Sequence, residues 1–158
     1  MYGSLPRIGR PAIARAVLDC DVTRDEALAC PGFATVKGRY NSYITVTGPD
    51  VDALMVAVQD HHGQVVGLRL RVVLRDGSKR YLHLSSRPDG PSAIARVHVA
   101  RPRDLRDATT VLITEGEIKA NIASDYMGTV CLSQPGAGSC VAETVEVAKA
   151  LNAERAVM

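Results

Sequence analysis

The sequence predicts a mixed α/β fold, with an N-terminal α+β lobe that carries an antiparallel basic sheet, followed by an incomplete βαβαβ half. Its 158 residues suffice for one domain or for two small subdomains. From Tyr43 to Leu84, alternating apolar and polar residues are separated by turns that contain Gly and Asp, which is typical of antiparallel hairpins. From Val111 onward, short apolar runs alternate with helical segments, which is typical of parallel strands. We therefore expect a lobe at 1–107 and a second domain at 108–158.

Two short helices are expected before the first strand. The segment Pro11–Leu18 has a proline suited to a first helical turn and apolar residues on one side. Thr23 followed by Glu26 has the spacing of a capping box, in which each side chain accepts a hydrogen bond from the backbone of the other residue. This spacing predicts a second helix that ends near Cys30-Pro31-Gly32.

The strands of the first lobe are marked by the turns between them. We expect them at Tyr43–Thr47, Leu54–Val58, Gln64–Leu74 and Tyr81–Leu84, with a further short strand at Val97–Val99 inside the Pro- and Gly-rich connection Arg87–Pro102. Arg69 and Arg71 alternate with apolar residues in the third strand, so they project together from the face opposite the core. Antiparallel pairing with the return strand is expected to bring Arg80 into the same neighbourhood, and His83 as well if the register allows it.

The C-terminal half alternates strands and helices. We expect strands at Val111–Ile113 and Val130–Leu132, the first residues of a third at Arg155–Met158, and helices at Glu115–Met127 and Val141–Leu151. Ile118, Ile122 and Tyr126 are spaced four apart in the first helix and so share a face, and Gly136-Ala137-Gly138 predicts a tight loop. In a doubly wound arrangement of this kind, ligands collect at the carboxyl ends of the strands.

Composition argues against several classes of protein. No stretch is long and apolar enough to cross a bilayer, and the N-terminus lacks the layout of a signal peptide, so we expect no membrane partner. The four cysteines form no C-x-x-C pair and no zinc-ligand spacing, which indicates reduced thiols in a cytoplasmic protein. Aromatic residues make up 4% of the chain, with no tryptophan, so a base-stacking platform would have few residues to use.

Charge is distributed unevenly along the chain. The segment Arg69–Arg106 contains ten basic and three acidic residues, a net charge of +7, whereas the remainder contains nine basic and fourteen acidic residues, a net charge of −5. Such asymmetry favours a face that binds phosphates. An ordinary solvated sheet face would give the same counts, so charge alone leaves both interpretations open.

Thr114–Ala120 is the segment most suggestive of chemistry. Glu115 follows a buried strand directly and begins a helix, so we expect its carboxylate at the rim of the sheet. A hard cation such as Mg²⁺ takes one or two carboxylates there and keeps its waters for substrate oxygens. Gly116 would let a ligand approach the backbone, and Lys119, one helical turn on, could hold a phosphate. The structural alternative is that acids in a first helical turn favour the helix macrodipole without any metal.

Val111–Ala120 resembles the opening motif of the TOPRIM domain shared by bacterial primases and topoisomerases, and Pro135–Gly138 is similar to the second, glycine-containing loop of that domain. The closer resemblance is to a primase-like domain in replication proteins of phages, plasmids and integrative elements, often described only as a domain of unknown function. Its further motifs occur here in the same order: Pro31-Gly32-Phe33, Gly38-Arg39-Tyr40, an apolar strand leading through Asp60 and Gly63 to an arginine-bearing strand (Val56–Arg71), Arg80–Ser86, Gly90-Pro91-Ser92 and His98. The order of these motifs, rather than any one of them, carries the resemblance.

The resemblance implies roles for particular residues. Glu115 would help to hold Mg²⁺ or Mn²⁺ and is a candidate general acid or base in nucleotidyl transfer by a two-metal mechanism. The basic surface before the TOPRIM motif would track the template or the incoming nucleotide. The candidate nucleic-acid-binding residues are Arg69, Arg71, Lys79, Arg80, Ser85, Ser86 and Lys119, and the candidate loop glycines are Gly116, Gly136 and Gly138. The implied partners are single-stranded DNA or a primer–template, with nucleotides and a helicase as further candidates.

One departure from the family pattern limits the expected activity. TOPRIM domains need an Asp-x-Asp at the end of the third strand, and nothing after Arg155 supplies it, since Asp125, Glu143 and Glu146 lie on predicted helices. We therefore expect a chain that is truncated before that motif and inactive on its own, from a longer protein with primase-type nucleotidyltransferase activity. The alternatives are a non-catalytic module that binds DNA or a replication partner, and a decayed fragment.

The remaining candidates have plainer interpretations. His61-His62 is expected in a solvated turn, and His83 and His98 are interpreted as strand residues satisfied by their neighbours. Ser139-Cys140 has no basic partner nearby in sequence, so we expect no nucleophile there.

Overall fold

A computed structural model of the protein describes residues 2–4, 14, 22–48, 53–73, 77–86 and 90–158. The chain divides into two compact units, each drawn from two stretches of sequence: Met1–Ala57 with Val66–Ile94, and Val58–Val65 with Ala95–Met158. The domain division expected after residue 107 stays a prediction. None of the helices in these described ranges is long and apolar enough to span a membrane.

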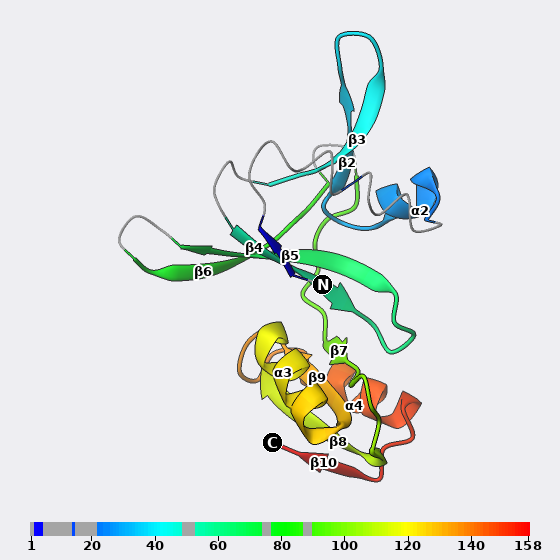
Figure 1. The fold of residues 1–158 in the computed structure, drawn as a ribbon, viewed down its shortest axis with the longest axis vertical. Coiled ribbons are helices and arrows are strands. Elements are labelled where there is room, and N and C mark those ends of the chain that lie inside the picture. Colours follow the sequence, from blue (N-terminus) through cyan, green and yellow to red (C-terminus); the bar gives the residue numbers. More distant parts are fainter. Residues whose placement is uncertain (1, 5–13, 15–21, 49–52, 74–76, 87–89) are drawn as a thin grey trace. The chain divides into compact units, whose positions relative to one another are not determined.

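The first unit contains a four-stranded sheet and a separate two-stranded ribbon (Figure 1). The sheet has the strand order β1 (Tyr2–Ser4), β4 (Ala53–Gln59), β5 (Val65–Val73) and β6 (Lys79–His83). β1 is antiparallel to β4, and β5 is antiparallel to β6. The ribbon pairs β2 (Phe33–Lys37) with β3 (Ser42–Val46), again antiparallel.

Helix α2 (Arg24–Ala29) begins at the predicted capping box. The backbone N–H of Glu26 donates to Thr23 Oγ1 at 3.2 Å, and the backbone N–H of Thr23 donates to Glu26 Oε2 at 2.8 Å. The hydrogen bonds from Thr23 lower the pKa of the Glu26 carboxyl, because they favour its charged form. The other predicted helix, Pro11–Leu18, lies outside the described residues except for the buried Ala14.

The sequence predicts only the second strand of the β2–β3 ribbon. β2 has a buried aromatic residue at its start and exposed residues at its end, so it lacks the sustained alternation on which strand prediction depends. Phe33 of β2 pairs with Val46 of β3, and both side chains are buried. The burial of Phe33 and Val46 holds β2 beside β3. Contacts between residues this far apart in the sequence cannot be identified from a five-residue pattern.

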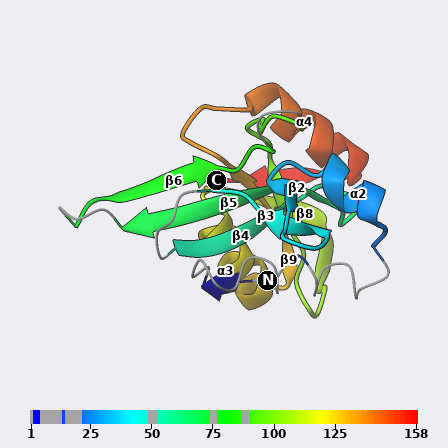
Figure 2. The same ribbon diagram turned by 90° about the horizontal axis from the view of Figure 1, so that it is seen from above.

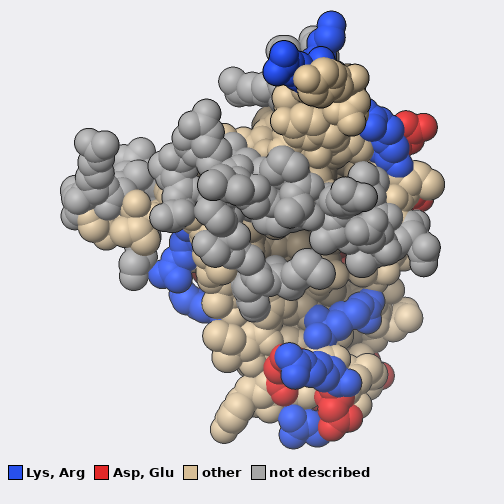
Figure 3. Space-filling model, turned by 45° about the horizontal axis from the view of Figure 1, so that its top comes forward, with Lys and Arg blue, Asp and Glu red and all other residues tan. Residues whose placement is uncertain are grey.

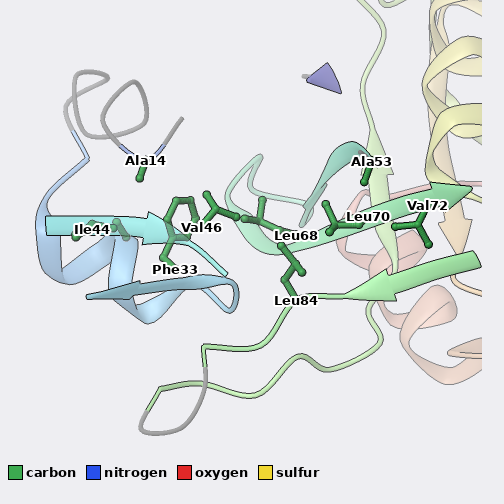
Figure 4. Close-up of a cluster of buried hydrophobic side chains, with 10 residues drawn as sticks. Ala14, Phe33, Ile44, Val46, Ala53, Leu68, Leu70, Val72 and Leu84 are labelled. Carbon is green, nitrogen blue, oxygen red and sulfur yellow. The ribbon is translucent and has the colours of Figure 1, made fainter. Parts of the chain in front are cut away.

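The core of the first unit is formed by the root of the ribbon, by β5 and by the segment that follows β6 (Figure 4). Gly32 has a φ of +102°, and a Cβ at this position would lie 2.9 Å from Leu84 Cβ. The Gly32 N–H donates to Ser86 Oγ at 3.0 Å, and the Gly32 carbonyl accepts from the Thr47 N–H at 2.8 Å. Gly32 therefore joins three segments at a point where only glycine fits. The buried side chains of this core include Phe33, Ile44, Val46, Ala53, Leu68, Leu70, Val72 and Leu84.

The second unit is built on a sheet with the strand order β10 (Arg155–Val157), β8 (Asp107–Glu115), β9 (Thr129–Gln134) and β7 (His98–Ala100). β8 is parallel to both β10 and β9, and β7 is antiparallel to β9. Helices α3 (Glu117–Met127) and α4 (Val141–Ala150) connect the parallel strands (Figure 2). The segment Val58–Val65, from the end of β4 to the start of β5, belongs to this unit.

The two helices of this unit cover opposite faces of its sheet. Val130 and Leu132 of β9 belong to the same cluster as Val147 of α4, whereas Cys131 belongs to a cluster with Ala120 of α3. Successive side chains of a strand point to opposite faces, so α3 and α4 lie on different sides. Strands and helices alternate here as predicted, and the protein has the predicted mixed α/β class with antiparallel sheets.

The apolar stripe of α3 faces solvent rather than the sheet. Ile122 and Tyr126, which share a helix face, are 64% and 80% exposed. The residues that are buried are small or polar, among them Ala120 and Ser124. Ser124 Oγ donates to the carbonyl of Thr129 at 2.7 Å, so the helix approaches the sheet closely through small side chains.

We expect Gly32→Ala to destabilise the protein more than Gly63→Ala does. Both glycines have a positive φ, a conformation that costs other residues about 1–2 kcal/mol. No atom lies within 4 Å of a Cβ placed at Gly63, whereas a Cβ at Gly32 would meet Leu84. Comparing the two variants by equilibrium urea unfolding therefore separates the cost of the contact with Leu84 from the cost of the positive φ. Equal losses of unfolding free energy would contradict the packing described for Gly32.

Candidate functional site

Glu115 is the last residue of β8 and is exposed at the carboxyl end of the sheet. The parallel ladder places Glu115 opposite Gln134, the last residue of β9, and the Gly116 N–H donates to the Gln134 carbonyl at 3.2 Å. Gly116 has a φ of +88° and precedes the first residue of α3, so the chain turns from strand to helix at a residue that tolerates this conformation. The ladder and the turn together hold Glu115 at the rim of the sheet.

Two other carboxylates, in the first turns of the flanking helices, are less accessible. Glu117 of α3 is 1% exposed. Glu143 of α4 accepts from the backbone N–H of Val97 at 3.1 Å and forms an ion pair with Arg96 at 3.4 Å. Glu115 is therefore the exposed and accessible carboxylate of these three.

A single exposed carboxylate fits a weakly held magnesium ion rather than a preformed metal cage. Mg²⁺ binds through one or two carboxylates and takes its remaining oxygens from water and phosphate. Within the described part of the chain, no group of three or more His, Cys, Asp or Glu side chains could hold a metal ion. The last paired residue of β10, Val157, lies opposite Leu112, three positions before Glu115, so the paired residues of β10 do not reach the level of that carboxylate.

The glycine loop after β9 lies at the same end of the sheet as the Gly116 turn, because it follows a strand parallel to β8. Ser139 closes the loop, since its N–H and its hydroxyl both donate to the Gly136 carbonyl, at 3.0 and 2.6 Å. Gly138 has a φ of +74°. Lys119 is exposed early in α3. The predicted glycines thus follow the ends of two adjacent parallel strands.

The two arginines of β5 differ in their exposure. Arg69 is 6% exposed, and its guanidinium lies 4.8 Å from the centre of the Tyr81 ring, within the range of a cation–π interaction. Arg71, two residues on, is half-buried and lies opposite Tyr81 in the β5–β6 ladder. Arg71 is therefore the more accessible of the two.

The register of β5 and β6 corrects one expectation about the basic sheet. Arg69 lies opposite His83, and Lys79 is in phase with this pair. Arg80 lies opposite Val72 and is out of phase with Arg69, so its position belongs to the other face of the sheet. The expected neighbourhood of Arg69 and Arg80 is thus wrong, because positions one residue apart on a strand alternate between faces.

The two serines after β6 accept hydrogen bonds from backbone groups of the first unit. Ser86 is buried, and its Oγ accepts from the Gly32 N–H at 3.0 Å. Ser85 is half-buried, and its Oγ accepts from the Ala93 N–H at 2.9 Å. Both hydroxyls help to hold loops in place, and their contact with phosphate stays a prediction.

Part of the positive charge of the segment Arg69–Arg106 is balanced by nearby carboxylates. In the second unit its ion pairs, at 3.4 to 4.0 Å, are Arg96–Glu143, Arg103–Asp125 and Arg106–Asp104. Exposed pairs of this kind contribute little stability, but they reduce the local positive field. At the bottom of the view in Figure 3, Lys and Arg side chains lie among carboxylates. These ion pairs therefore reduce the positive charge that residues 96–106 of the segment present in the second unit.

A buried histidine joins three segments of the second unit. His98 is 1% exposed, its Nδ1 accepts from the backbone N–H of Gln59 at 3.1 Å, and its Nε2 lies 3.2 Å from Asn121 Oδ1. Because Nδ1 accepts and the Asn121 oxygen also accepts, the ring is neutral with its proton on Nε2. Burial lowers the pKa of His98, against the opposing effects of the Asn121 hydrogen bond and the charge of Glu117.

The partners of His98 could not be identified from the sequence. His98 is a strand residue satisfied by its neighbours, as the sequence predicts. Gln59 and Asn121, however, lie 39 and 23 residues away along the chain. The burial of Glu117 is likewise not evident from the sequence, although this residue lies two positions after Glu115 in the same motif.

Three solved structures share the fold of this protein. The RNA polymerase domain of Mycobacterium tuberculosis primase DnaG, in complex with a double-stranded DNA oligomer with a 6-nucleotide overhang, matches with a TM-score of 0.53 and 16% identity, over 96% of this chain and 46% of that chain. The same domain in complex with double-stranded DNA matches with a TM-score of 0.54 and 15% identity, over 99% of this chain and 50% of that chain. A DnaG primase catalytic domain bound to single-stranded DNA matches with a TM-score of 0.50 and 17% identity, over 98% and 46% of the two chains.

These likenesses define the class of fold. The chain spans about half the length of the DnaG chains it matches. No family model matches the sequence, and no curated protein matches it. At this level of identity the similarity shows the fold alone, and that fold is primase-like.

We expect the stability of the protein to fall as the pH drops from about 7.5 to about 5.5, and His98→Gln to reduce this dependence. The folded-state pKa of His98 lies below its ordinary value of 6.5, so the unfolded chain takes up the proton first. The stability contributed by the neutral ring is fully present above pH 6.5 and is lost as the pH falls toward the folded-state pKa. Urea unfolding at the two pH values measures this loss.

A matched control for this prediction is His62→Gln, which removes an exposed histidine of the same unit. It should keep the pH dependence of the unmodified protein. The same pH dependence in His98→Gln as in the unmodified protein would show that His98 is not its source.

Proposed function

We propose that this chain is the nucleic-acid-binding core of a TOPRIM-containing, primase-like replication protein, and that it carries part of a metal site. The observation that carries the proposal is the position of Glu115, at the carboxyl end of a central parallel strand in a primase-like fold. The order of the sequence motifs, which resembles that of proteins from phages, plasmids and other mobile elements, supports placing the chain in that group.

In a longer protein, this core would contribute to a cytoplasmic enzyme that transfers nucleotides. Residues 1–107 would form the primase-like lobe, and residues 108–158 would form part of the TOPRIM domain. The DNA complexes of the DnaG domains support DNA as the class of ligand. Single-stranded DNA or a primer–template would be the form bound, with nucleotides and a helicase as further partners.

Glu115 would hold a divalent cation, Mg²⁺ or Mn²⁺, at the rim of the sheet. Bound there, the ion would supply positive charge to phosphate oxygens. Glu115 is exposed for this role, whereas Glu117 is buried and Glu143 is engaged by Arg96 and a backbone N–H. Lys119, exposed early in α3, would direct a second positive charge toward a phosphate.

Arg71 is the arginine of β5 that is best placed to contact a nucleic-acid backbone. It is partly exposed, whereas Arg69 is buried and stacks on Tyr81. Lys79 and Arg80 add two positive charges to the paired strand. Contacts between such side chains and phosphates give binding that is independent of sequence and weakens as the salt concentration rises.

A second candidate function is a non-catalytic module that binds DNA or a replication partner. The observation in its favour is that Glu115 is the accessible carboxylate among Glu115, Glu117 and Glu143, whereas a two-metal mechanism needs several ligands. The chain on its own would then bind nucleic acid without joining nucleotides. Salt-dependent binding, with no nucleotide incorporation at any Mg²⁺ or Mn²⁺ concentration, would favour this module.

Mn²⁺ should broaden the backbone amide resonances of Glu115 and Gly116, and Glu115→Gln should abolish that broadening. A neutral amide is a poorer ligand for a hard cation than a carboxylate, so the local effect of the metal depends on the charge of this side chain. Glu146→Gln, which removes an exposed carboxylate from α4, is the control and should leave the broadening unchanged. Amides near Glu115 that stay sharp in the unmodified protein would overturn the metal role.

Arg71→Ala should weaken the binding of a labelled single strand of about 20 nucleotides. One lost phosphate contact reduces the slope of log K against log salt by about 0.7 for single strands, so the loss should be largest in low salt. Fluorescence anisotropy between about 50 and 200 mM salt measures both quantities. Lys149→Ala, which removes an exposed charge from α4, is the control. If Arg71→Ala kept the affinity and the slope of the unmodified protein, Arg71 would not be a phosphate contact.

A further inference from the structure

The tip of the β2–β3 ribbon, residues 36–43, combines exposed aromatic rings with positive charge. Tyr40 is 88% exposed, and Tyr43 is 40% exposed. Lys37 and Arg39 supply two positive charges, and neither the two strands nor the turn between them contains an acidic residue. Because 4% of the whole chain is aromatic, two exposed tyrosines within four positions form a local concentration that the overall composition conceals.

The turn at this tip holds both rings at the surface. The Gly38 N–H donates to the Asn41 carbonyl at 2.7 Å, which closes the turn and leaves Arg39 and Tyr40 as its central residues. The Arg39 guanidinium lies 5.3 Å from the centre of the Tyr40 ring. A Cβ at Gly38 would come 3.2 Å from Tyr43 Cε1, so the Tyr43 ring lies close over the backbone of the glycine. The tip therefore presents one ring at its apex, next to a cation, and a second ring packed against the turn.

The opposite end of the ribbon is fixed in the core of the first unit (Figure 4). Phe33 and Val46, which pair across the ladder, are 3% and 1% exposed, and Ile44 is 5% exposed. Exposure rises from this root toward the turn. The root anchors the ribbon, so the Tyr40 ring at the other end is available for a partner and contributes little to the core.

We propose that this tip binds single-stranded nucleic acid by stacking one base on Tyr40, with Lys37 and Arg39 against the adjacent phosphates. A flat exposed ring beside cations matches a nucleotide, because every base has a π face and every linkage carries a negative charge. An acidic peptide would satisfy the charges but would leave the ring without a flat partner. A duplex keeps its bases stacked on one another, so it offers the ring no free base face. The inference rests on the proposed nucleic-acid-binding function and adds a contact surface to it.

Anisotropy with a labelled oligothymidine tests this surface. Tyr40→Ala should lose roughly tenfold in affinity, the effect of one base stack, with an unchanged salt slope because no charge is removed. Tyr40→Trp should retain the affinity, because the larger ring also stacks. Tyr126→Ala, which removes a tyrosine of similar exposure from α3, is the matched control and should bind like the unmodified protein.

Two further measurements separate stacking from charge. An abasic strand of the same length should bind the unmodified protein as weakly as oligothymidine binds Tyr40→Ala, and Tyr40→Ala should cause no further loss on that strand. Lys37→Ala combined with Arg39→Ala should instead reduce the salt slope by about 1.4, the value for two phosphates on a single strand.

The outcomes distinguish this inference from the broader function. If Tyr40→Ala binds like the unmodified protein while Arg71→Ala is weakened, the tip is not a contact surface and the proposed function stands. If Tyr40→Ala and Tyr126→Ala lose affinity equally, the loss is not specific to the tip and the inference fails. Binding of an acidic peptide in preference to oligothymidine, abolished by Tyr40→Ala, would assign the tip to a protein partner instead. If no oligonucleotide binds in low salt, both proposals are wrong.

Discussion

β8 and β9 pair in parallel from Val111 with Val130 to Glu115 with Gln134, and this ladder positions the candidate metal site of the second unit. Parallel strands end at the same edge of a sheet, so the strand-to-helix turn at Gly116 and the glycine loop after β9 lie at one rim. β10 pairs with the other side of β8, which makes β8 central. A shift of one residue in this register would move Glu115 to the opposite face. The site therefore depends on strand pairing more than on any contact of the carboxylate itself.

The charge of the chain shows why a net count is a poor guide to a binding surface. The arginines of the segment Arg69–Arg106 have different environments: Arg69 is buried against an aromatic ring, Arg96 bonds to a carboxylate, and Arg71 is partly open to solvent. Each arrangement changes how strongly the charge acts on a distant phosphate, because burial and ion pairing both reduce the outward field. Where a positive charge can act depends on its neighbours in the fold, and the sequence order alone does not show these neighbours.

Sequence patterns predicted the features that depend on interactions between residues close together along the chain. The capping box of α2, the turn at Asp60–Gly63 between β4 and β5, and the alternation of strands and helices after Val111 were all predictable, since each depends on residues a few positions apart. The exposed stripe of α3 was not, because small side chains on the sheet let Ala120 and Ser124 pack there in place of the isoleucines. Part of the candidate site could likewise be predicted from the sequence, and part could not. The rim position of Glu115 follows from the order of strand and helix, whereas the burial of Arg69 depends on which strand lies beside it.

The hydrogen bond between Gln59 and His98 also constrains the order in which the two units can fold as the chain is synthesised. The second unit takes Val58–Val65 from the middle of the chain and joins it to Ala95–Met158, and Gln59 bonds to His98 across 39 residues. At a synthesis rate of roughly 5–20 residues per second, Gln59 leaves the ribosome a few seconds before His98, whose Nδ1 accepts its hydrogen bond. All residues of the first unit precede Ala95, so that unit can fold during translation. The second unit has to wait for the C-terminal residues, and a fragment beginning at Ala95 would expose the Nδ1 atom that Gln59 covers.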